Sequence, residues 1–497
     1  MGLRPRTSRN HTRPSPVLSR SLARSLVFFT SASVLVIEIL AARLLAPYLG
    51  VSLEVFTGII GVILAGISIG AWLGGRAADR TDPRRLPGPL LVVGGLTALA
   101  SPLVIDVVGP GLSTDAVSIV VAAATAFFVP AAVLSAVPPV VVKIQLASLD
   151  ATGTVVGTYS AIGTAGAILG TFVTGFVLIA AFPTRPIVMV LGAALVVGGL
   201  ALAATRGSWA LLSVALGGML SFALIGIDGP CEHETTYHCA IVLDDEARPT
   251  GRTLILDRVS NSYVDLADPT YLQFRYVRLI ADVIAVEAPP GPVDLVSIGG
   301  GGFTLPGFIE ATRPGRQNVV LEIDPRLVEI GREELALGNR IEVVVDDARI
   351  SLRDVADFSA DVVIGDAYSG ASVPWHLTTV EFTAQIARVM TSDAVYVMNV
   401  IDYGDLEFIR AEAATLRRVF PEVVLFAPPD YLEGRSGGNF ILAASPADID
   451  IPGIEDAIRA RGGTELGIEG ERLDRFIGNA PALVDDYAPV DQMLGRP

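Results

Sequence analysis

Glycine and acidic residues in the second half of the sequence stand where they could hold a nucleoside. The apolar run 295–298 stops at four glycines, Gly299 to Gly302, and the run 319–321 ends on Glu322. Glycines let the backbone approach a ligand closely, and an acid about 20 residues further on can bond ribose hydroxyls. The stretch therefore predicts a strand, a tight turn, a helix and a second strand around a nucleoside.

Further carboxylates follow the next two apolar runs. Asp346, Asp347 and Ala348 come after the run 341–345, where an acid can accept a hydrogen bond from an adenine amino group. Asp366 ends the run 361–366, where it could take a proton from an amine. One such acid is more often a helix cap or a turn residue. Suitable groups at four successive strand ends instead favour one ligand site.

Alternating apolar and amphipathic segments supply the elements that must position these residues. Strands and helices alternate from residue 293, which predicts a mostly parallel sheet with helices on both faces and ligands outside the carboxyl ends of its strands. A small β-domain is expected over 235–265, followed by a helix over 271–286 that begins through Asp268-Pro269. The expected strands are 293–298, 318–322, 341–345, 361–366, 394–399, 422–427 and 438–443, and the expected helices between them are 303–312, 325–336, 349–356, 377–390 and 404–418.

The charges divide the 497-residue chain into two parts of different physical class. Residues 1–227 hold 14 Lys and Arg against 7 Asp and Glu, whereas residues 228–497 hold 22 against 45. The second part would repel phosphate, so we expect no nucleic-acid partner. We predict four regions: a disordered basic tail (1–24), a transmembrane helical domain (25–227), a small β-domain with a helix (228–290) and a Rossmann-like domain (291–497).

The first part contains seven apolar stretches, each near the ~20 residues needed to cross the hydrocarbon core. Their small residues recur at four-residue spacing, which lets helix backbones pack closely in lipid. They predict an α-helical transmembrane bundle and hence a multi-pass membrane protein with lipid around it. The stretches are about 25–46, 55–75, 87–108, 116–140, 154–181, 186–205 and 208–227.

The membrane side of the second part stays open. Positive charges place the tail and the loops with Arg76, Arg80 and Lys143 inside, so seven crossings would leave the chain outside after residue 227. Cys231 and Cys239, the only cysteines, lie eight residues apart just beyond the last stretch. They form either a disulfide, as in an oxidising compartment, or two reduced thiols.

Taken together, the motifs from about residue 234 to 491 resemble the spermidine synthase (polyamine aminopropyltransferase) family. IGGGGF, LEIDP, VVVDDAR and IGDAYSG stand where that family has its glycine loop, ribose-binding segment, adenine-contacting stretch and catalytic loop. ETTYHCAIV and LILDRVSNSYVDLADP resemble its N-terminal β-domain. The whole chain is similar to membrane-fused members of this family. Its stretch LVDDYAPVD resembles the closing motif of those fused proteins. This implies a Rossmann-like sheet of the methyltransferase type and a place in polyamine biosynthesis.

The resemblance also implies a donor site and a catalytic residue. Asp366 would remove a proton from the attacking amine, in a reaction that needs proximity and a base but no metal. Decarboxylated S-adenosylmethionine would be a co-substrate, not a permanently bound cofactor. Such donors are cytoplasmic metabolites. The donor therefore predicts that the second part lies in the cytoplasm, whereas the positive charges of the loops predict that it lies outside. The residues that would hold it are Gly299, Gly300, Gly301, Glu322, Asp346, Asp347 and Ala348; His238, Ser369 and Pro374 would contact the substrate.

Departures from the family pattern fall mainly on the amine side. Gly302 stands where the family has an acid in the glycine loop, and Ser369 where it has a second aspartate. The family's Tyr-His-Glu segment is replaced near Tyr271, and a binding glutamine by His238. The nucleoside half of the site is therefore intact and the diamine half is eroded, which speaks against putrescine as the acceptor.

We expect a membrane-anchored, spermidine synthase-like transferase with a small-molecule amine as acceptor, in a chain that could form a homo-oligomer. One alternative is an S-adenosylmethionine-dependent methyltransferase on the same sheet. Another is a non-catalytic or transport-linked membrane protein whose synthase-like domain only binds a ligand. Gly302 and Ser369 favour the alternatives, whereas Asp366, Glu322 and Asp347 favour the enzyme.

Overall fold

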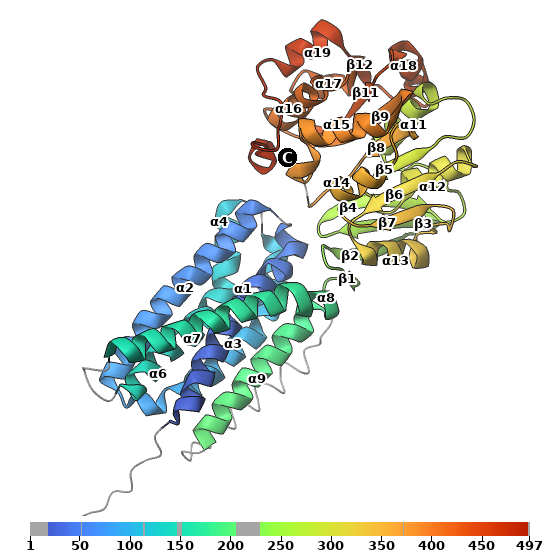
Figure 1. The fold of residues 1–497 in the computed structure, drawn as a ribbon. Coiled ribbons are helices and arrows are strands. Elements are labelled where there is room, and N and C mark those ends of the chain that lie inside the picture. The colour runs from blue at the N-terminus through green and yellow to red at the C-terminus, as the bar shows by residue number, and fades with distance from the viewer. Residues whose placement is uncertain are drawn as a thin grey trace, which may run out of the picture. The chain divides into compact units, whose positions relative to one another are not determined.

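The computed structural model describes residues 18–50, 52–112, 115–146, 152–204, 229–370 and 372–495 (Figure 1). The chain divides near residue 228 into a helical unit and an α/β unit, with residues 46–53 grouped with the second. The seventh span expected at 208–227 and residues 1–17 of the expected tail lie outside the described residues. The first helix already begins at Arg20, inside the segment expected to be a tail.

Among the described residues of the first unit, six helices are long and apolar enough to cross a membrane: Arg20–Leu49, Leu53–Arg80, Pro83–Gly111, Ala116–Gln145, Thr152–Ala181 and Thr184–Ala203. Within them lie α1 (Arg20–Leu49), α2 (Leu53–Arg80), α3 (Pro87–Val108), α4 (Ala116–Ala123), α5 (Val129–Ser135), α6 (Val137–Gln145), α7 (Thr152–Val173), α8 (Ile179–Ala181) and α9 (Thr184–Ala204). A Cβ at Gly70 of α2 would lie 2.0 Å from the Ala132 carbonyl oxygen, and one at Gly74 2.4 Å from that of Ala136. These glycines at four-residue spacing therefore allow close packing of helix backbones.

The α/β unit begins with a four-stranded antiparallel sheet of β1 (His233–Glu234), β2 (Cys239–Asp245), β3 (Arg248–Leu256) and β4 (Val259–Asp265). Cys231 and Cys239 form a disulfide, which decides between the two states left open by the sequence. The next helix, α11, runs from Arg275 to Glu287. Its expected start at Asp268-Pro269 was wrong, because the Asp268 side chain accepts from Thr270 N at 3.1 Å in a separate turn.

The main sheet has eight strands in the order β12-β10-β11-β9-β8-β5-β6-β7. Strands β5 to β9 are parallel, whereas β11 is antiparallel to both β9 and β10, and β12 is antiparallel to β10. The mostly parallel Rossmann-like sheet of the methyltransferase type is thus confirmed, and only β12 was not expected. The strands are β5 (Leu295–Ile298), β6 (Asn318–Glu322), β7 (Glu342–Val345), β8 (Ala360–Gly365), β9 (Met390–Asp402), β10 (Glu422–Ala427), β11 (Gly438–Ser445) and β12 (Leu466–Ile468).

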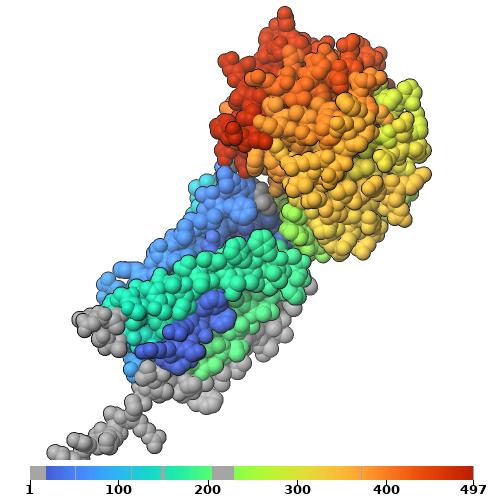
Figure 2. Space-filling model, in the orientation of Figure 1, coloured from blue at the N-terminus to red at the C-terminus, as the bar shows by residue number. Residues whose placement is uncertain are grey.

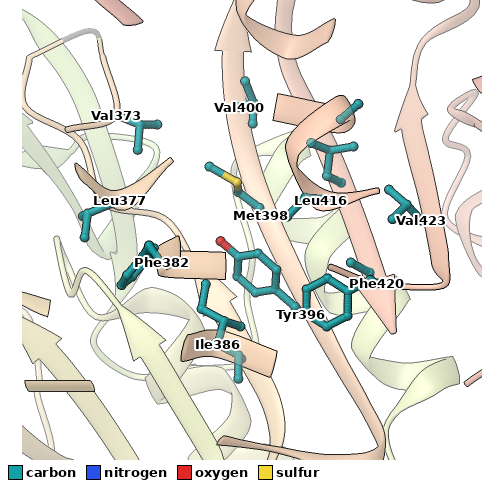
Figure 3. Close-up of a cluster of buried hydrophobic side chains, with 14 of the residues drawn as sticks. Val373, Leu377, Phe382, Ile386, Tyr396, Met398, Val400, Leu416, Phe420 and Val423 are labelled. Atoms are coloured by element: carbon teal, nitrogen blue, oxygen red, sulfur yellow. The ribbon is translucent and has the colours of Figure 1, made fainter. Parts of the chain in front are cut away.

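Helices cover both faces of this sheet because successive strand residues point to opposite sides. In β9, Tyr396 and Met398 join the core beneath α15 (Val380–Val389), α16 (Glu407–Leu416) and α19 (Gly470–Ile477) (Figure 3). Val397 joins the opposite core beneath α11, α12 (Thr304–Thr312) and α18 (Ile451–Ala460). The remaining helices are α13 (Pro325–Glu334), α14 (Ala348–Ser351), α17 (Pro429–Leu432) and α20 (Val490–Met493).

The C-terminal segment completes the α/β unit. It is red in Figure 2 and lies against orange residues of the same unit. Val380 N donates to Leu483 O at 2.9 Å, and Leu483 N donates to Thr415 Oγ1 at 2.8 Å. Leu483 is fully buried. The closing motif is therefore anchored to α15 and α16.

Candidate functional site

Backbone register alone brings the expected site residues to one edge of the sheet. Ile298 pairs with Leu321 on one side and with Gly365 on the other, and Glu322 pairs with Val345. The glycine loop, Glu322, Asp346 and Asp366 directly follow or occupy these strand ends. The four groups expected at successive strand ends are thus neighbours in space, as the sequence indicated.

The glycine loop passes very close to the Asp366 backbone. Gly299 has φ 89° and Gly301 φ 50°, both in the region that favours glycine. A Cβ at Gly299 would lie 2.5 Å from the Asp366 carbonyl oxygen. Any side chain at Gly299 would therefore push the glycine loop away from Asp366 at the end of β8.

Glu322 is tied to this loop and is 6% exposed. Its Oε2 accepts hydrogen bonds from Gly300 N at 2.8 Å and from Gly301 N at 3.3 Å, and its Oε1 accepts from Asp324 N at 2.9 Å. Burial raises the pKa of Glu322, whereas these amide bonds oppose the rise. The carboxylate thus fixes the loop, and with three amides bound, one of its four acceptor positions is left.

Every amide of the loop already donates to a group of the protein. Gly299 N donates to Leu321 O at 2.9 Å, Gly302 N to Ser262 Oγ at 2.9 Å and Phe303 N to Gly300 O at 2.7 Å, while the two amides between them donate to Glu322. Loops that bind phosphate do so with free backbone N–H groups. This loop therefore has no free backbone amide between Gly299 and Phe303 to offer a pyrophosphate.

Asp347 lies at the start of α14, where it has two protein partners. Its Oδ1 accepts from Arg349 N at 2.8 Å, and its Oδ2 lies 3.0 Å from His376 Nε2. Asp346 Oδ1 in turn accepts from Asp347 N at 2.8 Å, and Ala348 is the first residue of the helix. His376 could not be predicted from the strand ends, because it follows Pro374 in a separate one-turn helix.

The closing motif holds this side of the site in place. Asp485 forms an ion pair with Arg349 and accepts from Thr379 Oγ1 at 2.7 Å. Arg349 also donates to His376 O at 2.6 Å. Asp485 therefore reaches Asp347 through Arg349 and His376.

Apolar surface is exposed beside these acids. Ile323, next to Glu322, is 40% exposed, and Val345, next to Asp346, is 46% exposed. Exposed apolar side chains between polar groups are typical of ligand sites.

Asp366 is held by an amide network on the neighbouring strands. Its Oδ1 accepts from Asn399 Nδ2 at 2.9 Å, and Asn399 Oδ1 accepts from Asn439 Nδ2 at 2.9 Å. Burial raises the pKa of Asp366 to about 6, although hydrogen bonds from Asn399 and Tyr276 lower it. Asn399 was missed, although it is the last residue of an expected strand and the strand-end argument would have found it.

Tyr276 is a tyrosine that reaches Asp366, and the motifs did not indicate it. Tyr271 instead stacks under the Arg248 guanidinium, 3.8 Å from its ring centroid. The Tyr276 hydroxyl lies 3.3 Å from the Asn261 carbonyl oxygen and close enough to Asp366 to affect its pKa. Tyr276 lies in the first turn of α11, which begins at Arg275, whereas Tyr271 precedes the helix.

The remaining expected residues are His238, Ser369 and Pro374. His238 Nδ1 lies 3.0 Å from Asp257 Oδ2. Burial lowers the pKa of His238, but Asp257, Asp324 and Glu322 raise it overall. The ring therefore lies near Glu322. Ser369 pairs with Ser372 in a tight turn through Gly370, whose φ is 66°. Pro374 directly precedes the one-turn helix that carries His376, and Ser369 follows Asp366 in its loop.

Comparisons with known proteins agree with these motifs. No family model matches the chain. The polyamine aminopropyltransferase of Vibrio vulnificus is 27% identical over 176 residues, which are 35% of this chain and 56% of that protein. That of Chromobacterium violaceum is 26% identical over 141 residues, 28% of this chain and 53% of the relative. The chain thus spans about half the length of the curated relatives it matches.

Among solved structures, a probable spermidine synthase from Corynebacterium glutamicum is 27% identical to this chain, with a TM-score of 0.48. The alignment covers 53% of this chain and 98% of that one. The sequence relatives show a spermidine synthase-like domain, and six apolar helices precede it in the described part of the chain. This confirms the resemblance drawn from the motifs.

Proposed function

We propose that the chain is a membrane-anchored aminopropyltransferase that uses decarboxylated S-adenosylmethionine as donor to an amine. The observation that carries the proposal is that Glu322, Asp347 and Asp366 gather at a glycine loop without free amides. Carboxylates there attract a cationic sulfonium and repel a phosphate. The name polyamine aminopropyltransferase borne by the curated relatives supports the same reaction class.

In the proposed complex, the donor's nucleoside lies along the strand ends. Glu322 accepts hydrogen bonds from the ribose, Asp347 accepts one from the adenine amino group, and Ile323 covers one face of the base. The sulfonium and its propylamine chain then point toward Asp366. This places the reacting carbon beside Asp366, whose pKa burial raises to about 6.

Asp366 acts as the general base of the proposed reaction. The amine nitrogen attacks the carbon bonded to the sulfonium, the carbon–sulfur bond breaks, and its electron pair returns to sulfur as methylthioadenosine leaves. The proton released from the nitrogen passes to Asp366. A carboxyl whose pKa lies at about 6 is mostly ionised at neutral pH, yet holds a proton more readily than an exposed aspartate.

The six apolar helices serve as the membrane anchor in this proposal. They fit a multi-pass membrane protein by length and hydropathy. The reaction itself uses residues of the α/β unit alone.

A methyltransferase is the second candidate, because neutral Gly302 and Ser369 remove charges that a polyamine would need. Ordinary S-adenosylmethionine differs from the decarboxylated donor by one carboxylate, which would have to lie near the charge of Asp366. We therefore expect the decarboxylated donor to bind more tightly. Methyl transfer from S-adenosylmethionine would leave S-adenosylhomocysteine, whereas aminopropyl transfer from the decarboxylated donor leaves methylthioadenosine.

Calorimetry of the full-length protein in detergent micelles tests the proposal. Decarboxylated S-adenosylmethionine, S-adenosylmethionine and methylthioadenosine are titrated separately. Tighter binding of the decarboxylated donor and of methylthioadenosine supports aminopropyl transfer. Preference for S-adenosylmethionine would favour the methyltransferase. If none of the three compounds binds, the hypothesis of a non-catalytic membrane protein is favoured.

A further inference from the structure

We infer that the acceptor is a monoamine with an uncharged, hydrogen-bonding tail rather than a diamine. This inference rests on the proposed function and names the substrate class of the same site. Its basis is a small cavity beside Asp366 and the glycine loop, where β4, α11 and α12 meet β5 and β8.

The polar groups of this cavity are almost all neutral. Among its described lining residues, Asp366 is the only ionisable carboxylate, and none carries a positive charge. The other side chains that can hydrogen-bond are Asn261, Ser262, Tyr276, Ser297 and Thr304. Such a lining suits hydroxyl or amide groups of a ligand.

Asp366 is already committed in the proposed reaction, since it takes the proton of the attacking nitrogen. A diamine carries a second ammonium group at neutral pH. Burying that charge without a carboxylate is costly. Glu322, the next carboxylate along the loop, accepts three backbone amides and faces the ribose side.

The hydrogen bonds of Asn261 and Ser262 point to the same conclusion. Ser262 Oγ donates to Asn261 Oδ1 across 2.6 Å, which takes one of the two acceptor positions of this oxygen, whereas the amide nitrogen can serve a ligand. That nitrogen is a donor only. It can bond a ligand oxygen, but it would repel an ammonium group.

The same strand also excludes an acid from the glycine loop. Ser262 Oγ accepts from Gly302 N at 2.9 Å, and a Cβ at Gly302 would lie 2.5 Å from Ser262 Cβ. Gly302 is therefore a packed position, covered by the β-domain, rather than an open place from which one side chain was lost. The neutral lining is a built feature of this chain.

Three acceptors of equal chain length test the inference in the full-length protein with decarboxylated S-adenosylmethionine: putrescine, 4-aminobutanol and 4-aminobutanoate. Methylthioadenosine release is measured for each. We expect kcat/KM for the amino alcohol to exceed that for putrescine by about tenfold, since one buried ammonium lacks its charged partner. Equal or faster reaction with putrescine, or fastest reaction with the amino acid, would overturn the inference.

A charge added to the cavity provides the second measurement. Asn261→Asp keeps the side-chain shape and should lower the ratio of amino alcohol to putrescine kcat/KM by about tenfold. The matched control, Asn339→Asp, adds the same charge at an exposed position outside the cavity and should leave the ratio unchanged. Equal ratios in the two variants would contradict the inference.

Binding of methylthioadenosine separates the two levels of the proposal. If neither donor nor product binds to the wild-type protein, the proposed function itself fails. If both bind and no acceptor of the series reacts, the proposed donor site stands and the acceptor inference fails. Retained product binding by Asn261→Asp shows that this variant is folded.

Discussion

Asn399 donates from its side-chain nitrogen to Asp366 Oδ1 across 2.9 Å, on two adjacent parallel strands. Asn439, from β11, donates to the oxygen of the same amide at 2.9 Å and thereby fixes which end faces the carboxylate. The hydrogen bond favours the charged form of Asp366, while burial favours the neutral form. The balance of these two effects sets the pH range in which Asp366 can accept a proton.

Removal of the Asn399 amide should move the pH profile of transfer. In Asn399→Ala the charged form of Asp366 loses a hydrogen bond, so its pKa rises further above about 6. Activity needs the carboxylate, so the acidic limb of kcat should shift upward by about one pH unit. Asn339→Ala, at an exposed position, is the control; an unmoved limb in Asn399→Ala would refute the link.

Asp366→Asn should abolish transfer but preserve donor binding. The amide has nearly the same shape and cannot take a proton, so we expect kcat to fall about 100-fold or more. Asp354→Asn, at an exposed position on the same unit, should behave like wild type. Methylthioadenosine formation at the wild-type rate in Asp366→Asn would remove this residue from the mechanism.

Asp485→Asn should weaken the donor site from a distance. The change breaks the ion pair that holds Arg349, which bonds the backbone of His376 next to Asp347. We expect KM for the donor to rise about tenfold with kcat nearly unchanged. Asp486→Asn alters the adjacent, exposed residue and is the matched control. A fall in kcat alone would contradict a positioning role.

Glu412→Gln should stabilise the α/β unit at neutral pH. Glu412 is 1% exposed, no described residue bonds its Oε2, and burial raises its pKa well above the ordinary value. The folded state then keeps a proton that the unfolded state loses, so stability falls as the pH rises above the unfolded-state pKa. Glutamine removes this loss, and we expect about 1 kcal/mol or more of stabilisation.

Thermal unfolding of full-length protein in micelles at two pH values checks this expectation. The gain from Glu412→Gln should be present at pH 7 and absent near pH 4, where both states are protonated. Glu471→Gln, at an exposed position in α19, should change little at either pH. A gain that does not depend on pH would indicate another cause.

The disulfide between Cys231 and Cys239 should leave no free thiol in the native chain. We expect a maleimide reagent to label the unfolded, unreduced protein at neither position and to label two sites after reduction, because the sequence contains no other cysteine. Intact cells are lysed directly into denaturant that contains the maleimide, with or without prior reduction, and mass spectrometry of the purified protein counts the labels. Two labels without reductant would show reduced thiols and a reducing compartment.

The sequence was sufficient for groups that the backbone register brings together. Gly299, Glu322, Asp346 and Asp366 lie at successive ends of parallel strands, and the carboxyl ends of such strands must meet at one edge. Apolar periodicity identified those strands. No knowledge of side-chain packing was needed to place these groups together.

The sequence was insufficient where contacts join separate segments. Ser262, His376 and Asn439 reach the site from another sheet, a one-turn helix and an antiparallel strand, and their spacing carries no signal. Tyr276 also carried no signal, and Asp268-Pro269, which resembles a helix start, forms an independent turn before α11. Such contacts are decided by tertiary packing.

Ser262 and Gly302 also constrain how this site can change by descent. An aspartate at position 302 would collide with the Ser262 side chain, whereas loss of Ser262 first would leave the Gly302 amide without its acceptor. Each single substitution is therefore harmful alone, although the pair together could be tolerated. A protein with Ser262 and Gly302 would need both substitutions at once to acquire an acidic loop. We therefore expect the neutral acceptor site to be retained among its descendants.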